Sequence, residues 1–303
     1  MIVCFDIGGT AIKGAYARAP DDIDTLPRRP TPLHDFDTFV GTLRAVIAEA
    51  PEPVSSVTIS ITGVIDAETR LITVANIPCL DQRPIEADLG KALGLPVIVS
   101  NDADCLAMAE AGAGAGQGHR VVFGVILGTG VGGGLVVDGR LINSDGGFAG
   151  EWGHGPAAPR FGGTPEVELP AFACGCGLKG CLDATVSARG MEKIHRYLCA
   201  EEKTSEEITA AWLAGEEKAA RTIDVLCDVT AGPLSMLVNT VGAGIVPVGG
   251  GLARCAPLIA EIDRRVRARI LKKLDRPLVV PGLCTIEPGL VGAAVLAFNR
   301  GFA

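Results

Sequence analysis

Residues 2–10 read IVCFDIGGT, an apolar run that ends in a carboxylate, two glycines and a hydroxyl. The run predicts a β-strand, and residues 12–16 can return beside it as the second strand of a hairpin. Glycine lets backbone N–H groups approach phosphate oxygens, and Asp6 would hold Mg²⁺ through water, because magnesium prefers carboxylate, water and phosphate oxygens. The expected cofactor contacts of this turn are Asp6, Gly8, Gly9, Thr10 and Lys13.

The same pattern recurs later in the chain. An apolar strand over residues 121–127 leads into a glycine-rich turn and a return strand at residues 135–137, and a third strand over residues 245–248 ends in three glycines. The expected phosphate and nucleotide contacts are Gly128, Thr129, Gly130 and Gly132, followed by Gly249, Gly250 and Gly251. Ordinary tight turns are the alternative. The glycines match neither a Walker A loop nor a Rossmann fingerprint.

Between these turns, strands alternate with helical segments. Helical spacing is found at residues 37–49, 85–93, 103–111, 186–198, 205–213, 222–241, 256–270 and 290–299. Asp37 or Thr38 is the expected N-cap of the first of these helices. Alternating strands and helices predict an α/β fold, and the hairpins predict mixed rather than purely parallel sheets. The repeated hairpin pattern further suggests two related halves.

The composition excludes several classes of protein. Apolar residues make up 48% of the 303 residues, and the net charge of −8 disfavours nucleic acid as a partner, because phosphate binding needs patches of Lys and Arg. No apolar stretch is long enough to span a bilayer, and the first residues lack a signal-like pattern. We therefore expect a soluble, cytoplasmic protein that binds neither nucleic acid nor membrane.

Asn101 and Asp102 follow an apolar strand at residues 97–100 and precede a helix. Ligands of α/β folds bind at the carboxyl ends of strands. Phosphorylation of a hydroxyl needs a base near the attacking oxygen, a role that suits Asp102, while Asn101 suits hydrogen bonding to neighbouring hydroxyls. The alternative is that Asp102 simply caps the helix.

One glycine-rich stretch of eight residues, from Cys174 to Cys181, contains three cysteines: Cys174, Cys176 and Cys181. Their density suits a zinc site of the Cys₃His type, with His154, 20 residues upstream, as the fourth ligand. Four protein ligands would make the zinc structural, and three unrelated free thiols are the alternative. If one ring nitrogen of His154 binds zinc, the other can face a substrate, with Glu151 beside it to accept hydroxyl hydrogen bonds.

Taken together, these residues resemble the ROK family (repressor, open reading frame, kinase). The matching motifs, in order, are Asp6-x-Gly8-Gly9-Thr10, Asn101-Asp102-Ala103-Asp104, Leu127–Gly134, Gly150–His154 and Cys174–Cys181. The resemblance implies a two-domain actin/hexokinase-like (ribonuclease H-like) ATPase fold that closes around sugar and ATP. We expect residues 1–110 and a closing helix at 290–303 to form the N-terminal domain, and residues 111–289 to form the C-terminal domain. The resemblance also implies a homodimer.

The resemblance assigns roles to individual residues. It implies Asp102 as the base at the sugar 6-hydroxyl, and Asn101, Glu151 and His154 as sugar contacts. Within the family the chain most resembles the bacterial N-acetylglucosamine kinases. The resemblance lies in Asn76-Ile77-Pro78, in the sequence ILGTGVGGG of residues 126–134 and in the long spacer between His154 and Cys174. On this basis Asn76 is a further sugar contact and Gly63 a close-approach position. A turn residue before Pro78 is the alternative for Asn76.

Two positions depart from the family pattern. The family usually has Glu where this chain has Asp183, which pulls the carboxylate back by about one carbon–carbon bond. We therefore expect Asp183 to be a weakened or water-mediated sugar contact, which leaves glucose and N-acetylmannosamine as alternative substrates. Pro247 interrupts a strand that is usually unbroken in the family and removes a ladder donor.

Three functions from different classes compete. The first is a kinase that uses ATP, Mg²⁺ and a structural Zn²⁺ to phosphorylate the 6-hydroxyl of N-acetylglucosamine. The second is a sugar-sensing repressor, which we expect to be excluded because Asp6 leads directly into the phosphate hairpin and leaves no room for a DNA-binding domain ahead of it. The third is a non-catalytic sugar-binding relic, suggested by Asp183 but disfavoured by Asp6, Asp102 and both hairpins. The kinase is the function that we expect.

Overall fold

The computed structural model describes residues 1–284 and 287–301, and the chain divides into two compact units. The first unit comprises residues 1–118, 134–149 and the described part of 284–303, and the second comprises residues 119–133 and 150–283. The domain limits expected from the sequence, 1–110 with 290–303 and 111–289, stay a prediction. Residues 302 and 303 of the expected closing segment, and 285 and 286 before it, lie outside the described residues.

The first unit is built on a six-stranded mixed sheet with the order β3-β2-β1-β5-β8, and β4 pairs with β2. Its strands are β1 (Ile2–Ile7), β2 (Ala11–Ala19), β3 (Asp22–Thr25), β4 (Arg29–Pro30), β5 (Ser56–Ile61) and β8 (Val97–Asn101). Strands β1 and β2 are antiparallel, whereas β1, β5 and β8 run parallel. The predicted hairpin and the predicted mixed sheet are confirmed.

A second sheet has the order β11-β10-β9-β14-β15. Its strands are β9 (Val121–Leu127), β10 (Val131–Val137), β11 (Arg140–Leu141), β14 (Val246–Gly249) and β15 (Val279–Pro281), while β6 (Val64–Ile65) with β7 (Ile72–Thr73) and β12 (Phe161–Gly162) with β13 (Val167–Glu168) form two small ribbons. Strands β9, β14 and β15 are parallel, as β1, β5 and β8 are. The two sheets therefore share one strand order, which confirms the repeat seen in the sequence.

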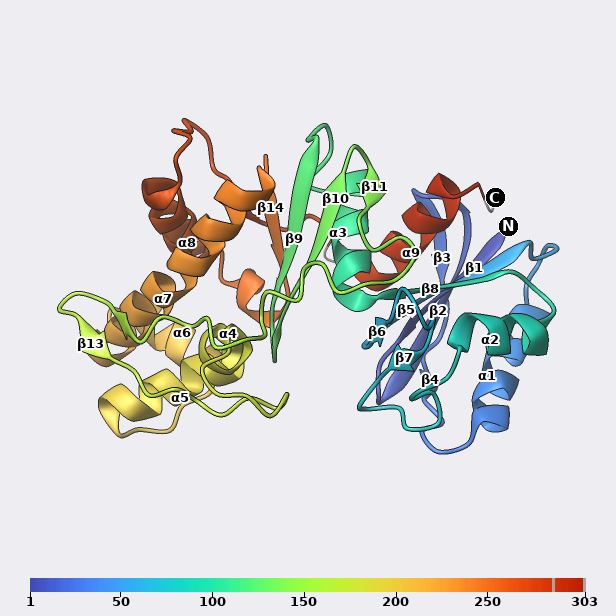
Figure 1. Cartoon of the computed structure of the whole chain (residues 1–303), viewed down its shortest axis with the longest axis horizontal. Coiled ribbons are helices and arrows are strands. Elements are labelled where there is room, and N and C mark those ends of the chain that lie inside the picture. Colours follow the sequence, from blue (N-terminus) through green and yellow to red (C-terminus); the bar gives the residue numbers. More distant parts are fainter. Residues whose placement is uncertain (285–286, 302–303) are drawn as a thin grey trace. The chain divides into compact units, whose positions relative to one another are not determined.

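Helices cover both faces of the first unit's sheet (Figure 1). The helices of the chain are α1 (Phe36–Ala48), α2 (Ile85–Leu93), α3 (Asp102–Ala113), α4 (Leu182–Val186), α5 (Ala188–Cys199), α6 (Ser205–Leu213), α7 (Glu217–Val241), α8 (Ala256–Arg269) and α9 (Pro288–Asn299), with a 3₁₀ turn η1 (Gly251–Arg254). Strand β1 sends Val3 and Phe5 into the core shared with α1 and α2, and Ile2 and Cys4 against α9. Because side chains alternate along a strand, covering both faces buries the whole strand.

Helices α3 and α9 of the first unit pack with almost no space between them. A Cβ atom at Gly292 of α9 would lie 1.8 Å from the carbonyl oxygen of Cys105 in α3, and one at Gly112 of α3 would lie 2.7 Å from Val295. Helix α3 is buried over nearly its whole circumference, as expected of a helix packed on all sides. Glycine at position 292 is therefore a packing requirement.

Three local details differ from or refine the sequence prediction. Asp35, rather than Asp37 or Thr38, caps α1, since its side chain accepts a hydrogen bond from the Thr38 backbone N–H. The helix expected over residues 186–198 is found as α5, which begins at Ala188 because Ser187 is extended and caps it, and the short helix α4 before it was not expected. Pairing between β14 and β9 is found on either side of Pro247 but not at it, as the missing N–H requires.

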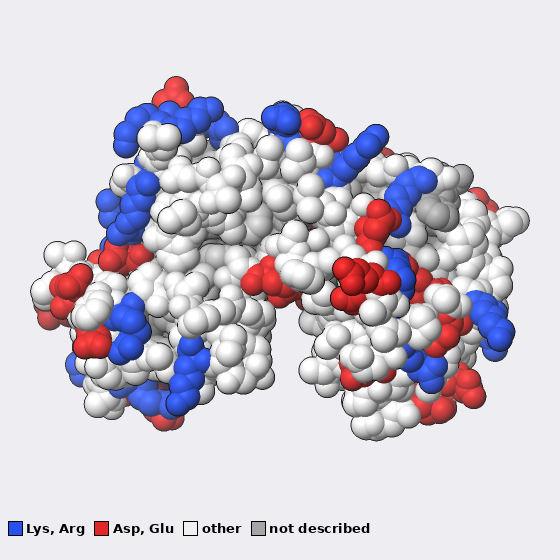
Figure 2. Space-filling model, viewed as in Figure 1, with Lys and Arg blue, Asp and Glu red and all other residues white. Residues whose placement is uncertain are grey.

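The surface charge and the apolar character of the helices concern the expectation that the protein binds neither nucleic acid nor membrane. On the face drawn in Figure 2, acidic and basic side chains occur together over much of the surface. Among the described residues, no helix has the length and apolar character needed to cross a bilayer.

The close approach of α3 and α9 gives a test of the fold. Gly292→Ala should destabilise the protein by about 3 kcal/mol, because its methyl group would overlap backbone that cannot move aside. Gly41→Ala in α1 is the matched control: a Cβ atom there meets nothing within 4 Å, so alanine should stabilise the helix by about 0.5–1 kcal/mol. Urea unfolding monitored by circular dichroism measures both, and equal stabilities for the two variants would contradict this packing.

Candidate active site

Asn101 and Asp102, at the junction of β8 and α3, have different structural roles. The Asn101 Oδ1 accepts a hydrogen bond from the Ala103 backbone N–H at 2.7 Å, so Asn101 caps α3. Asp102 is the first residue of the helix, which makes the alternative reading of Asp102 as the cap wrong. The Asn101 Nδ2 also donates to the Gly63 carbonyl oxygen at 2.9 Å. The cap thus leaves Asp102 in the first turn of α3, where the helix dipole favours a negative charge.

Four residues predicted from separate parts of the sequence lie together in the first unit. Asn101 is bonded to Gly63, and a Cβ atom at Gly9 would lie 3.3 Å from the side chain of Asn76. The Asn76 Nδ2 donates to the Thr62 hydroxyl, next to Gly63, at 3.3 Å. A Cβ atom at Gly63 would lie 2.9 Å from a neighbouring backbone carbonyl, so packing within the protein requires glycine there, and its expected close approach in the sugar pocket stays a prediction. Thr62 was missed, although a hydroxyl at a strand end before glycine is a usable signal.

The first glycine turn is fixed from outside the hairpin. The Thr31 hydroxyl donates to the Gly8 carbonyl oxygen at 2.7 Å, and the Thr31 backbone N–H donates to the Thr10 carbonyl at 3.3 Å. Within the turn, the Gly8 N–H donates to the Ala11 carbonyl at 3.1 Å. The turn is therefore held in shape by backbone groups, while the side chain of Thr10 is exposed.

Asp6 lies at the centre of a charged cluster in the first unit. Its carboxylate accepts hydrogen bonds from the Ser60 hydroxyl at 3.0 Å and from the Lys13 ammonium at 2.9 Å, and Lys13 also pairs with Glu287 at 2.7 Å. A Cβ atom at Gly289 would lie 2.5 Å from the Asp6 carboxylate, so the start of α9 approaches this group closely. Ser60 and Glu287 were missed, because neither belongs to a recognisable motif.

Lys13 is bound to carboxylates in this structure. Burial alone would lower the pKa of Lys13, but its hydrogen bonds to Asp6 and Glu287 outweigh this effect and raise the pKa. The expected role of Lys13 as a phosphate donor stays a prediction.

The glycine turns of the second unit lie against each other. A Cβ atom at Gly250 would lie 2.5 Å from the Leu127 carbonyl oxygen, and one at Gly128 would lie 3.7 Å from Gly250 and from the Gly251 nitrogen. Gly250 has φ +89°, a conformation that side chains disfavour. Next to these turns is a pocket of about 320 Å³, lined by Ser205, Glu206, Thr209, Ala210 and Leu213 of α6 and by Gly251, Leu252, Arg254, Cys255 and Pro257. The structure therefore joins the second and third glycine turns, whose expected contacts also include Thr129, Gly132 and Gly249.

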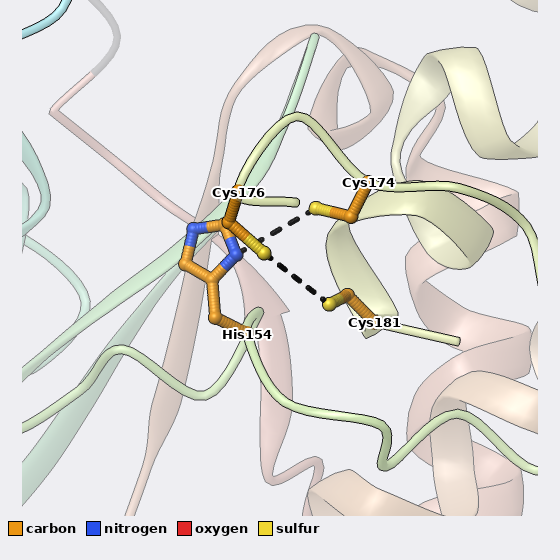
Figure 3. A group of neighbouring side chains, drawn as sticks. All are labelled: His154, Cys174, Cys176 and Cys181. Atoms are coloured by element: carbon orange, nitrogen blue, oxygen red, sulfur yellow. Dashed lines mark hydrogen bonds between the residues drawn. The ribbon is translucent and has the colours of Figure 1, made fainter. Parts of the chain in front are cut away.

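The predicted metal ligands come together in the second unit (Figure 3). The ligand atoms of His154, Cys174, Cys176 and Cys181 all lie within 4.8 Å of one another, with 3.8 Å from Cys174 Sγ to His154 Nδ1 and 3.7 Å from Cys176 Sγ to Cys181 Sγ. A tetrahedral site with zinc–sulfur bonds of about 2.3 Å requires sulfur atoms about 3.8 Å apart. The cluster therefore has the spacing that a tetrahedral metal needs.

The thiols of this cluster differ in their readiness to ionise. A hydrogen bond from the Leu178 backbone N–H lowers the pKa of Cys176 to about 7, whereas burial raises the pKa of Cys174 to about 12. Metals bind the thiolate form, so binding displaces protons from these sulfurs.

Glu151 stands on the side of His154 that faces away from the sulfurs. The Nε2 atom of His154 is 3.9 Å from Glu151 Oε2, while Nδ1 is the nitrogen near Cys174. Burial raises the pKa of Glu151, a shift that His154 opposes and Asp183 reinforces. This two-sided placement of the imidazole is the arrangement expected of a histidine that holds a metal and faces a ligand.

Asp183 makes contacts that the sequence did not predict. Its Oδ1 accepts a hydrogen bond from the Val131 backbone N–H at 2.8 Å, and its Oδ2 lies 3.7 Å from Cys174 Sγ. The carboxylate therefore lies between the metal cluster and the second glycine hairpin. The expected contact of Asp183 with a sugar stays a prediction.

The mixed sheets, their common strand order and their glycine hairpins define the actin-like sugar kinase fold. The ROK family pattern matches residues 2–300, so the chain belongs to the ROK family. It is 33% identical, over 98% of its length and 99% of the relative, to an N-acetyl-D-glucosamine kinase of Photobacterium profundum.

Two solved structures are similar over almost the whole chain. One is a ROK hexokinase from Thermus thermophilus, with 29% identity and a TM-score of 0.83 over 99% of this chain and 98% of that one. The other is a ROK family glucokinase from Streptomyces griseus in complex with glucose and AMPPNP, with 26% identity and a TM-score of 0.76 over 98% and 99%.

The metal cluster gives a second test. The purified protein should contain about one metal ion per chain, and Cys176→Ser should lose it and lower the melting temperature by about 5 °C or more. Cys199→Ser, outside the cluster, should keep both metal and stability. Elemental analysis together with thermal unfolding measures this, and the hypothesis fails if Cys176→Ser retains the wild-type metal content.

Proposed function

We propose that this chain is an ATP-dependent sugar kinase that transfers the γ-phosphoryl group of ATP to the 6-hydroxyl of N-acetylglucosamine. The observation that carries the proposal is the placement of Asp102 on the first residue of α3 while Asn101 supplies the cap. Membership of the ROK family and similarity to an N-acetyl-D-glucosamine kinase support the activity and the choice of sugar.

Asp102 is the proposed base. From the first turn of α3, its carboxylate can accept a hydrogen bond from the sugar hydroxyl and take its proton as the oxygen attacks phosphorus. Since phosphoryl transfer depends mainly on positioning and charge stabilisation, one well-placed carboxylate is enough on the acceptor side.

The nucleotide would be held by the glycine turns. Backbone N–H groups of Gly9 and Thr10 and of Thr129 and Gly130 suit phosphate oxygens, and the pocket beside Gly251 suits the adenosine end. Asp6 is the proposed Mg²⁺ residue, acting through water, and it fits because Ser60 and Lys13 hold its carboxylate at the strand end. Mg²⁺ would neutralise charge on the phosphates.

The sugar contacts are proposed from both the geometry and the family. In the first unit these are Gly63, Asn76 and Asn101, which the structure brings together. In the second unit they are Glu151 and His154. Hydrogen bonds between the sugar hydroxyls and the groups of the first unit would orient the 6-hydroxyl toward Asp102.

The metal is proposed to be a structural zinc held by His154, Cys174, Cys176 and Cys181. Four protein ligands of this kind and spacing fit zinc and leave no open position for hydrolysis. The zinc would fix the orientation of the His154 ring, and thereby the part of the proposed sugar site that His154 and Glu151 form.

Glucose and N-acetylmannosamine remain the alternative substrates, since they differ from N-acetylglucosamine by one substituent or one stereocentre. The similarity to a glucokinase crystallised with glucose is the reason to test glucose beside N-acetylglucosamine as a substrate. The homodimer implied by the family and the cytoplasmic location expected from the composition stay predictions.

The activity is tested by coupled ADP release with Mg-ATP and N-acetylglucosamine. Asp102→Asn should lower kcat by about 100-fold or more while the protein stays folded, because it removes the base and keeps the side-chain shape. Asp37→Asn is the matched control, an acidic residue in the first turn of α1 with no proposed role. Full activity of Asp102→Asn, or no sugar-dependent ADP release by the wild type with any of the three sugars, would overturn the proposal.

A further inference from the structure

The segment that follows the last metal ligand braces the second glycine hairpin at both ends. After Cys181, the Asp183 side chain accepts from the Val131 N–H at 2.8 Å, and the Ala188 N–H donates to the Gly128 carbonyl at 2.8 Å. Inside the turn, the Gly128 N–H donates to the Gly130 carbonyl at 3.0 Å. The turn is thus fixed at its first and last residues by one short segment.

The same segment is fixed to the metal cluster. Asp183 is two residues from Cys181, its Oδ2 is 3.7 Å from Cys174 Sγ, and its backbone N–H donates at 2.8 Å to the carbonyl of Gly153, the neighbour of His154. Asp183 therefore contacts the cluster with one carboxylate oxygen and the hairpin with the other.

The hairpin is shaped to receive this carboxylate. A Cβ atom at Gly130 would lie 2.6 Å from Asp183 Oδ1, and one at Gly153 would lie 2.4 Å from the Val131 carbonyl oxygen. Glycine at both positions is needed for the contact. A second brace comes from Trp152, whose indole N–H donates to the Gly132 carbonyl at 2.9 Å. Close packing on both sides makes the contact of Asp183 part of the architecture of the turn.

We propose that Asp183 is a positioning residue for the nucleotide: it holds the Gly128–Val131 turn so that the N–H groups of Thr129 and Gly130 meet phosphate, and it makes the metal cluster a support for the nucleotide side. The proposal rests on the proposed kinase function, and it gives Asp183 a different task from a sugar contact. A carboxylate accepting a backbone N–H forms a charge-assisted bond, which is stronger than a neutral one. The anchored turn would then not need to be ordered when the nucleotide binds.

The test separates nucleotide binding from sugar binding. A fluorescent ADP analogue with Mg²⁺ is titrated into wild type, Asp183→Ala and Asp183→Asn without sugar, and KM for ATP and for N-acetylglucosamine is measured in parallel. Asp183→Ala should weaken nucleotide binding by about tenfold and leave the sugar KM within about twofold, since one charged hydrogen bond to the turn is lost. Asp183→Asn keeps an acceptor oxygen and should fall between the two. Lys179→Ala, an exposed position in the same loop, is the control and should bind as wild type.

The outcomes distinguish the possible failures. Unchanged nucleotide affinity in a folded, metal-loaded Asp183→Ala overturns the proposal, and a rise in the sugar KM alone assigns Asp183 to the sugar instead. If Asp183→Ala does not fold, Asp183→Asn decides: nucleotide binding weakened by about threefold supports the anchor, and unchanged binding overturns it. A wild type that binds the analogue without phosphorylating any sugar refutes the proposed function, while the binding measurements still decide the role of Asp183.

Discussion

The parallel register of β1, β5 and β8 is the constraint on which the first unit depends. Asp6 pairs with Ser60, and Ser60 with Ser100, next to Asn101 on the same strand end. Because parallel strands in register end at one edge, the hydrophobic burial of the sheet brings these polar residues together. Apolar packing on both faces fixes the strands, and the chemistry follows from where they end.

The hairpin of the second unit depends on side-chain contacts as well as on strand ends. It repeats the β1–β2 pattern without a carboxylate equivalent to Asp6. Supports from elsewhere, the indole of Trp152 and the carboxylate of Asp183, hold the start of β10. Both supports lie two residues from predicted metal ligands in the sequence, so a loop with little regular structure is bound to the hairpin by side chains.

Local sequence patterns predicted most of the helices and strands. The features that they missed depend on contacts between residues far apart in the sequence. The hairpins, the grouping of His154 with three cysteines and the helix after Asn101 follow from alternation, glycine and cysteine spacing. The cap on Asn101 could not be told from one on Asp102, because both residues favour that position. Glu287 pairs with Lys13 although the two residues are far apart in the sequence, and Asp183 accepts a hydrogen bond from Val131 in the hairpin. Neither contact leaves a periodic signal in the sequence. The short helix α4, which ends just before Ser187, was not predicted.

The central claim is that the chain transfers a phosphoryl group from ATP to the 6-hydroxyl of an aminosugar. The most direct measurement is NMR of the product formed from Mg-ATP and N-acetylglucosamine, which reads the bond made rather than the ATP consumed. The account predicts phosphorus coupled to carbon 6 of the sugar. Phosphorus coupled to carbon 1, or inorganic phosphate as the only new species, would contradict it.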